Sequence, residues 1–310
     1  MNRATRVPGR VWTRVPQTLL SILGFGFLFL VGSVEARKSQ PFAPRPIPPQ
    51  SLPTGPKIWL QDAQALRVTH VGATPSAARA AKSIASGRSA PLSMLNGDFD
   101  GDGIEDLVVG YASPGGGALV LHRGNLDAFA PQSEAAFQAI AHGQFPPPFL
   151  AEAQVFDVPI RPDLIAAGDF SGNGRLDLVV ASRGASALYI LPNDGAGKFQ
   201  APQLLRLTGT VTALAAGNMG IGRALTNVLV GLADPGNSFS LLVLGCADFG
   251  LGAVATFPLS GPASNFSFGN FGDPFEDAAF LSGGQVVLLH SSSRQLENLS
   301  LPANASLIWR

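Results

Sequence analysis

From Leu92 onward the sequence contains four copies of a short segment in which a glycine and an acidic or amide residue open a loop between apolar runs. The four copies read LSMLNGDFDGDGIEDLVVGY, LIAAGDFSGNGRLDLVVASR, ALAAGNMGIGRALTNVLVGL and FSFGNFGDPFEDAAFLSG. Their opening glycines, Gly97, Gly168, Gly217 and Gly269, are spaced 71, 49 and 52 residues apart. Self-similarity at such a period is typical of a fold built from repeated units.

Each copy has the same neighbours along the chain. One apolar run precedes the loop, a second such as DLVVG or DLVVA follows it, and a third appears after a glycine-rich turn. The third runs are ALVLH at 118–122, ALYIL at 187–191, LLVLG at 241–245 and QVVLLH at 285–290. Strands joined in this way form an antiparallel meander. A unit of about 50 residues buries its two faces only when copies stack radially, as they do in a β-propeller.

The fold class predicted from these repeats is all-β, a β-propeller of four-stranded blades of about 50 residues. It spans residues 57–310, with repeat cores near 97–110, 168–181, 217–231 and 269–281. Propellers have roughly four to eight blades, so four cores leave two alternatives: an incomplete or truncated array, or a ring that degenerate strands close. Residues 57–91 could lend strands to a further blade, and within them the alanine-rich stretch 73–90 fits a helix or a loop.

The first unit is about 20 residues longer than the next two, and the excess falls in Leu126 to Ala153. We interpret this stretch as a loop excursion on one rim of the propeller, because insertions in repeat proteins map to loops on one face. Its four phenylalanines are expected to pack the loop down, and the alternative is that they contact a ligand. They are Phe129, Phe137, Phe145 and Phe149.

Residues 1–36 are predicted to be a signal peptide. Four arginines precede an apolar run from Leu19 to Val31, and Val34 and Ala36 are small residues at the positions that a signal peptidase inspects. The proline-rich residues 37–56 predict a semi-extended linker. Export predicts a secreted, periplasmic or cell-surface location. Membrane attachment is expected only if the N-terminal apolar segment stays uncleaved.

The first repeat core, GDFDGDGIEDL, places oxygen-bearing side chains at alternate positions. Asp98, Asp100 and Asp102 occupy positions 1, 3 and 5, the Ile104 carbonyl is available at position 7, and Asp106 ends a nine-residue span. Calcium takes roughly six to eight oxygen ligands, and a tight acidic loop with this spacing can wrap one Ca²⁺ ion. The alternative is an acidic surface turn without an ion. An EF-hand is not indicated, since position 12 is a valine and an apolar β-type run follows.

These motifs resemble the FG-GAP or VCBS repeat family, which includes the head of integrin α subunits; GDFDGDGIEDLVVG and GDFSGNGRLDLVVA carry the resemblance. It implies a propeller whose inter-strand loops hold Ca²⁺ and whose other loops recognise ligands, in extracellular or periplasmic proteins. Carried over to the second loop, it implies a weaker calcium site with fewer carboxylates. Those ligands are Asp169, Ser171, Asn173, the Arg175 carbonyl and Asp177. The third and fourth loops are expected to be structural.

No catalytic motif is present in the sequence, so the protein is predicted not to be an enzyme. His122 and His290, at the ends of apolar runs, are expected to face solvent. Nucleic acid is not expected as a partner, since the net charge is zero and no basic run occurs in the body of the chain. The predicted function is a calcium-binding adhesion or ligand-binding module for a protein or carbohydrate. The alternatives are a non-catalytic accessory region of a secreted enzyme, such as a polysaccharide-active one, and a lectin-like sugar binder.

Overall fold

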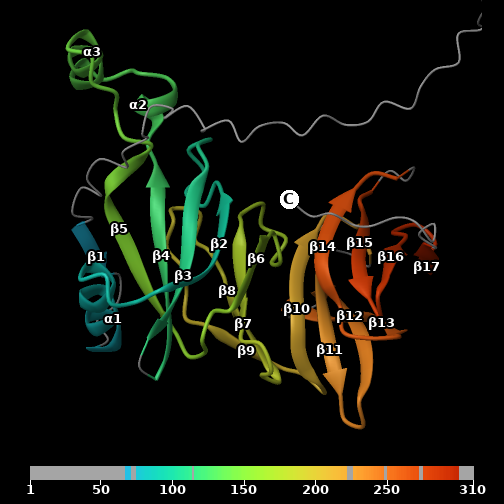
Figure 1. Ribbon diagram of the computed structural model, residues 1–310. Coiled ribbons are helices and arrows are strands. Elements are labelled where there is room, and N and C mark those ends of the chain that lie inside the picture. The colour runs from blue at the N-terminus through green and yellow to red at the C-terminus, as the bar shows by residue number, and fades with distance from the viewer. Residues whose placement is uncertain are drawn as a thin grey trace, which may run out of the picture. The chain divides into compact units, whose positions relative to one another are not determined.

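The computed structural model describes residues 67–70, 75–113, 115–221, 226–247, 250–271 and 275–299. All of them belong to one compact unit, Trp59–Arg310, and the predicted signal peptide (1–36) and linker (37–56) lie outside the described residues. The described part contains 17 strands in four sheets and three helices (Figure 1). The all-β prediction is therefore confirmed. None of the described helices has the length and apolar character needed to span a bilayer.

The first sheet holds the first repeat core and has the strand order β1-β5-β4-β3-β2. Its strands are β1 (Arg67–His70), β2 (Pro91–Gly97), β3 (Asp106–Ser113), β4 (Gly116–Gly124) and β5 (Phe149–Val158). Four of them form an antiparallel meander, and β1 adds to its outer edge by pairing in parallel with β5. The described strand before Pro91 thus extends the first sheet.

A helix covers one face of this first sheet. Helix α1 (Pro75–Ala85) forms in the alanine-rich stretch, where either a helix or a loop was expected, and alanine favours the helix because it loses no side-chain entropy there. Ala80 and Ala81 are buried and form one apolar cluster with residues of β4 and β5. The members from the sheet are Ala118, Val120, Ala153 and Val155. Small side chains on both partners let the helix approach the sheet closely.

The other three sheets are simple four-stranded antiparallel meanders in chain order. The second contains β6 (Leu164–Gly168), β7 (Asp177–Ala181), β8 (Ala187–Leu191) and β9 (Gln203–Arg206). The third contains β10 (Thr210–Gly217), β11 (Asn227–Asp234), β12 (Ser238–Ala247) and β13 (Gly250–Leu259). The fourth contains β14 (Ser264–Gly269), β15 (Asp277–Ser282), β16 (Gln285–Leu289) and β17 (Leu296–Leu299).

Each predicted repeat core is the loop between the first and second strands of one sheet. The opening glycine is the last residue of the first strand, and it pairs with the residue that begins the second strand. These pairs are Gly97 with Asp106, Gly168 with Asp177, Gly217 with Asn227, and Gly269 with Asp277. The four loops therefore occupy equivalent places in the four sheets, as the repeat predicted.

The sheets pack on one another in series through their first strands. Strand β2 contacts β6, β6 contacts β10, and β10 contacts β14, whereas no comparable contact joins β14 to β2 in the described part of the chain. The second residue of each of the first three loops is apolar and packs between its own sheet and the next. Phe99, Phe170 and Met219 are buried in the apolar clusters between successive sheets, while the corresponding Phe271 of the fourth loop is 57% exposed. The array is thus an incomplete propeller of four blades.

The opening glycines explain how closely successive sheets approach. A Cβ atom on Gly97 would lie 2.8 Å from Leu176, and one on Gly168 would lie 2.4 Å from Thr226. At Gly217 the Cβ would lie 2.3 Å from the ring of Phe268. In each case the obstructing side chain belongs to the next unit of the series, so a larger residue at any of the three positions would require that side chain or its sheet to shift.

The insertion after β4 is partly helical. It contains α2 (Leu126–Phe129) and α3 (Glu134–Ala141), whose N-caps are the side chains of Asn125 and Ser133. Of the predicted excursion 126–153, the last residues belong to β5. The helices have the cap residues that favour helix initiation, but α2 buries no residue and α3 buries only Ala136.

The prediction that the phenylalanines of the insertion pack against the body is wrong for three of the four. Phe129, Phe137 and Phe145 are 68%, 52% and 83% exposed, whereas Phe149 is half-buried at the start of β5. Helices of one and two turns are too short to bury a broad apolar face. The insertion therefore presents apolar side chains to solvent.

Candidate metal centre and its neighbours

The first loop is organised around Asp98. Its Oδ1 atom accepts hydrogen bonds from the backbone N–H groups of Gly101 at 2.7 Å and Asp102 at 3.2 Å, and its Oδ2 atom accepts one from Gly103 at 3.0 Å. Gly101 and Gly103 have φ values of 76° and 86°, in the left-handed region that glycine adopts without steric cost. These two turns fold the loop back toward its first carboxylate.

Three of the four predicted carboxylate ligands lie together. One oxygen from each of Asp98, Asp100 and Asp106 is within 4.8 Å of the others, a spacing that fits ligands of a single oxygen-coordinated cation. The carboxylate of Asp102 is outside this group and accepts a hydrogen bond from the Ile104 N–H at 2.8 Å. The donor set present therefore suits a hard divalent cation, with Asp98, Asp100 and Asp106 as the residues that would hold it.

Asp106 is buried, with 1% of the residue exposed. Its Oδ2 atom accepts from the Phe99 N–H at 3.0 Å, and its Oδ1 atom accepts from the Gly124 N–H at 2.8 Å. Burial raises the pKa of Asp106 above its usual value, although these two N–H groups act in the opposite direction. Asp106 thus ties the loop to the end of β4, whether or not an ion is bound.

Arg123, near the end of β4, supplies a positive charge to the loop. Its guanidinium forms a hydrogen-bonded ion pair with Oδ2 of Asp100, and the Asp100 side chain is only 2% exposed. The sequence analysis missed Arg123, which is 23 residues from Asp100. The signal that could have found it is the hairpin register, since His122 pairs with Leu107 and Arg123 therefore follows opposite Asp106.

The second loop satisfies its polar groups internally. Asp169 accepts from the N–H groups of Asn173 at 2.9 Å and Gly174 at 2.8 Å. Oδ2 of Asp177 accepts from both the N–H and the hydroxyl of Ser171, at 3.1 Å and 2.9 Å. Ser171 thus hydrogen-bonds to the carboxylate of Asp177. At the same position of the first loop stands Asp100, which has a carboxyl group in place of the hydroxyl. The Arg175 side chain donates to the Asp194 carbonyl. The backbone carbonyl of Arg175 remains a predicted ligand.

The residue that begins the second strand links its loop to the end of the third strand in all four sheets, a role that was not predicted from the sequence. Asp106 accepts from the Gly124 N–H, and Asp177 and Asp277 accept from the N–H groups of Asn193 at 2.8 Å and Ser291 at 2.7 Å. In the third sheet the Asn227 amide donates to the carbonyls of Ile221 and Leu244 at 2.8 Å and 3.2 Å. These side chains join the loop to the end of the third strand of the meander.

The two histidines predicted to face solvent do not do so fully. His122 is 9% exposed, and burial lowers its pKa below the usual value. His290 has its Nε2 atom 2.9 Å from Glu297 and its Nδ1 atom 3.6 Å from Asp277. The hydrogen bond to Glu297 raises the pKa of His290 above its usual value. The prediction is wrong for His122 because the insertion and β5 cover that end of β4; the ring of Phe149 lies 6.1 Å from that of His122.

Hydrogen bonds also link loops of successive sheets. The Asn193 amide, after β8, donates to the Phe99 carbonyl of the first loop at 2.7 Å. In the last two sheets, the Asn218 N–H donates to Glu276 at 2.7 Å, and the Glu276 N–H donates to the Asn218 carbonyl at 3.1 Å. The loops therefore support one another as well as their own hairpins.

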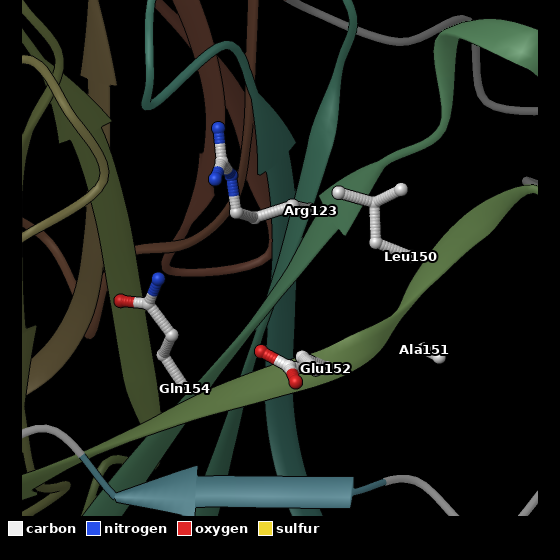
Figure 2. Close-up of a pocket in the computed structure, with 5 residues that line it drawn as sticks. All are labelled: Arg123, Leu150, Ala151, Glu152 and Gln154. Atoms are coloured by element: carbon white, nitrogen blue, oxygen red, sulfur yellow. The ribbon is translucent and has the colours of Figure 1, made fainter. Parts of the chain in front are cut away.

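Two cavities adjoin these loops. One of about 310 Å³ borders the second loop and includes Ser171, Asn173 and Asp177 in its wall. The other, of about 220 Å³, is lined by Arg123, Leu150, Ala151, Glu152 and Gln154 (Figure 2). Oε1 of Gln154 is buried and has no hydrogen-bond partner within the described residues.

Four-stranded meanders packed in series, each with an equivalent first hairpin loop, define a propeller-type repeat protein. Residues 169–219 match the family model of the FG-GAP-like repeat. The matched segment begins in the second loop and ends in the third, so the sequence repeat takes three strands from one sheet and the first strand of the next. The chain therefore contains an FG-GAP-like repeat, and the resemblance predicted from the sequence is confirmed.

Comparison with other proteins adds little beyond this family match. Curated proteins yield no match to the chain. Two similar solved structures are those of BBS1N in complex with ARL6DN, in crystals soaked with lead or with mercury, at 14% and 15% sequence identity. Both have a TM-score of 0.33 and cover 71% of this chain and 64% of the other chain, so this chain spans less than two thirds of their length. A likeness at that TM-score carries no argument about fold or function.

Proposed function

We propose that this chain is an exported, non-catalytic binding module in which calcium stiffens the first hairpin loop and the helical insertion contacts a protein partner. The observation that carries the binding role is the exposure of Phe129, Phe137 and Phe145 on the insertion. Leu126, Ile140 and Leu150 add exposed apolar surface within the same stretch of chain. Clustered exposed apolar side chains on a soluble protein are typical of an interaction site.

A protein partner is favoured over a carbohydrate by the kind of aromatic residue that is exposed. Sugar-binding sites commonly use tryptophan and tyrosine, whose rings stack on sugars and whose polar atoms bind hydroxyl groups. Among the described residues, the strongly exposed aromatic side chains are all phenylalanines. Phenylalanine supplies apolar contact area without a polar atom, which suits an apolar pocket or groove on a protein.

Calcium is proposed at the first loop because three carboxylates converge there and two of them, on Asp100 and Asp106, are nearly fully buried. Bound Ca²⁺ would supply positive charge that offsets the repulsion between these carboxylates. Asp98 would hold both the ion and the loop backbone, and Asp106 would connect the ion to β4. The second loop is the weaker candidate, since it offers the two carboxylates of Asp169 and Asp177 where three converge in the first loop.

The binding role is tested by photo-crosslinking. A photoactivatable phenylalanine analogue at position 145, in the full chain, is expected to give discrete crosslinked products with surface proteins of the source cells. Excess unlabelled wild-type chain should suppress them, and excess Phe137→Ser/Phe145→Ser chain should not, because an interface loses most of its affinity with its buried aromatic anchors.

Position 204 provides the matched control, because Leu204 on β9 is also an exposed apolar residue, at 46%. A probe there is expected to give none of these products. Equal crosslinking from positions 145 and 204, or suppression by the double serine variant as effective as by wild type, would rule out the insertion as the contact surface.

A further inference from the structure

The side chain of Arg123, on β4, brings a positive charge to the first loop. The guanidinium of Arg123 is paired with Asp100, and Asp100 is almost completely screened from solvent by this contact and its surroundings. Among equivalent positions at the ends of the third strands, β8 is followed by Pro192, β12 has Gly245 and β16 is followed by His290. Arginine therefore occurs in the sheet whose loop has a carboxylate at position 3, where Ser171 stands in the second loop.

A guanidinium and a divalent cation cannot both use the same carboxylate oxygen at contact distance, since their positive charges repel. Oδ2 of Asp100 accepts from the Nε and Nη2 atoms of Arg123. Asp100 is also one of the three carboxylates whose oxygens lie within 4.8 Å of one another. An ion that binds Oδ2 of Asp100 has to displace the arginine, and an ion that binds Oδ1 lies next to the guanidinium, whose positive charge repels it.

The cavity beside Arg123 contains other acceptors for a displaced guanidinium. Arg123 lines the 220 Å³ cavity together with Glu152 and Gln154. In Figure 2 its guanidinium points away from the Glu152 carboxylate, consistent with its pairing with Asp100. The cavity offers the Glu152 carboxylate and the unpaired Oε1 of Gln154 as acceptors. A long, flexible arginine side chain can exchange one set of acceptors for another without moving the backbone of β4.

We propose that Arg123 is a built-in competitor of calcium, pairing with Asp100 in the metal-free loop and turning toward Glu152 and Gln154 when the ion binds. This inference rests on the proposed calcium site. The loop then has two states, one in which Arg123 pairs with Asp100 and one in which the ion does. The strength of the arginine pair sets the calcium concentration at which the loop changes from the first state to the second. The loop then holds its shape at low calcium.

Calorimetric titration of the full chain with CaCl₂ tests the competition. Arg123→Gln is expected to bind calcium about tenfold more tightly than wild type, the size of effect that follows from removing one charge-assisted pair that binding must break. Arg123→Lys keeps the charge but loses the contact of two nitrogens with Oδ2 of Asp100, so its affinity should lie between the two. Arg161→Gln is the charge-matched control, because Arg161 pairs with Asp163 away from the loop, and its affinity should equal that of wild type.

Glu152→Gln tests the second position of the arginine and should change affinity in the opposite direction. It removes the negative charge that receives the displaced guanidinium and leaves a weaker, neutral acceptor, so calcium should bind several-fold more weakly than to wild type. In the Arg123→Gln background the same substitution should have no effect, because no guanidinium remains to be received.

The outcomes separate this inference from the proposed calcium site. Equal calcium affinities for wild type, Arg123→Gln and Arg123→Lys would overturn the competition and leave the site itself standing. No calcium binding by any of these folded chains up to about 10 mM, the weak end of the range for extracellular calcium modules, would overturn both.

Discussion

Gly217→Ala is expected to destabilise the protein by about 2 kcal/mol or more, the upper part of the range for overpacking an interior. The added methyl would lie 2.3 Å from Cδ1 and 2.4 Å from Cε1 of Phe268, on the first strand of the next sheet. The Phe268 ring is partly buried against the apolar cluster of the third and fourth sheets, so the added methyl requires either the ring or the fourth sheet to shift. Chemical denaturation of the folded variant measures this loss.

Gly269→Ala is the matched control for this prediction, because Gly269 is the equivalent glycine of the fourth sheet. Its added Cβ would meet only Phe271 of its own loop, at 3.3 Å, and Phe271 is largely exposed and can give way. This variant should lose less than about 1 kcal/mol. If the two variants lose equal stability, the close packing of successive sheets at the opening glycines is not what requires glycine there.

Asp177→Ala is expected to cost about 3 kcal/mol of folding free energy even in the presence of a chelator. The substitution leaves the buried N–H of Asn193 without an acceptor and also removes the partner of the Ser171 N–H and hydroxyl. An unpaired buried donor costs about 1–3 kcal/mol, and the Asn193 N–H becomes one, while the exposed Ser171 loses two hydrogen bonds that water can partly replace. Urea denaturation with chelator present measures the loss without any contribution from metal.

Asp169→Ala is the control within the same loop. Asp169 accepts from N–H groups that are exposed, so water can replace the lost acceptor and the expected cost is below about 1 kcal/mol. Asp177→Asn should fall between the two, since Asn227 has this role in the third sheet. An Asp177→Ala variant no less stable than Asp169→Ala would refute the structural role of the residue that begins the second strand.

The sheets were predictable from sequence because the opening glycine and the residue that begins the second strand recur as a pair. The pair fixes the hairpin register, and the apolar runs on either side then fix the strands. Gly97 with Asp106 and Gly168 with Asp177 are paired as expected. The third and fourth sheets were recognisable from the same pattern even though their loops lack the full acidic spacing.

Other features depend on contacts that loop spacing does not encode. The local sequence places Asp98 and Asp100 with Asp106, but not Arg123, because that contact depends on the pairing of β3 with β4. Spacing also suggested that Asp102 belongs with the other carboxylates, whereas its side chain turns to the Ile104 N–H. The exposure of Phe137 and Phe145 was missed because apolar composition predicts burial on average, and short helices with no sheet beneath them are the exception.

The central claim, that calcium stabilises the propeller through the first loop, is tested most directly by thermal melting of the protein with millimolar calcium and with excess chelator. Calcium should raise the melting temperature of wild type, because an ion that binds only the folded state stabilises it. Asp100→Ala should lose most of this rise, and Glu105→Ala should keep it, since Glu105 lies in the same loop but outside the carboxylate group. An unchanged melting temperature of the wild type in calcium and in chelator would contradict the account.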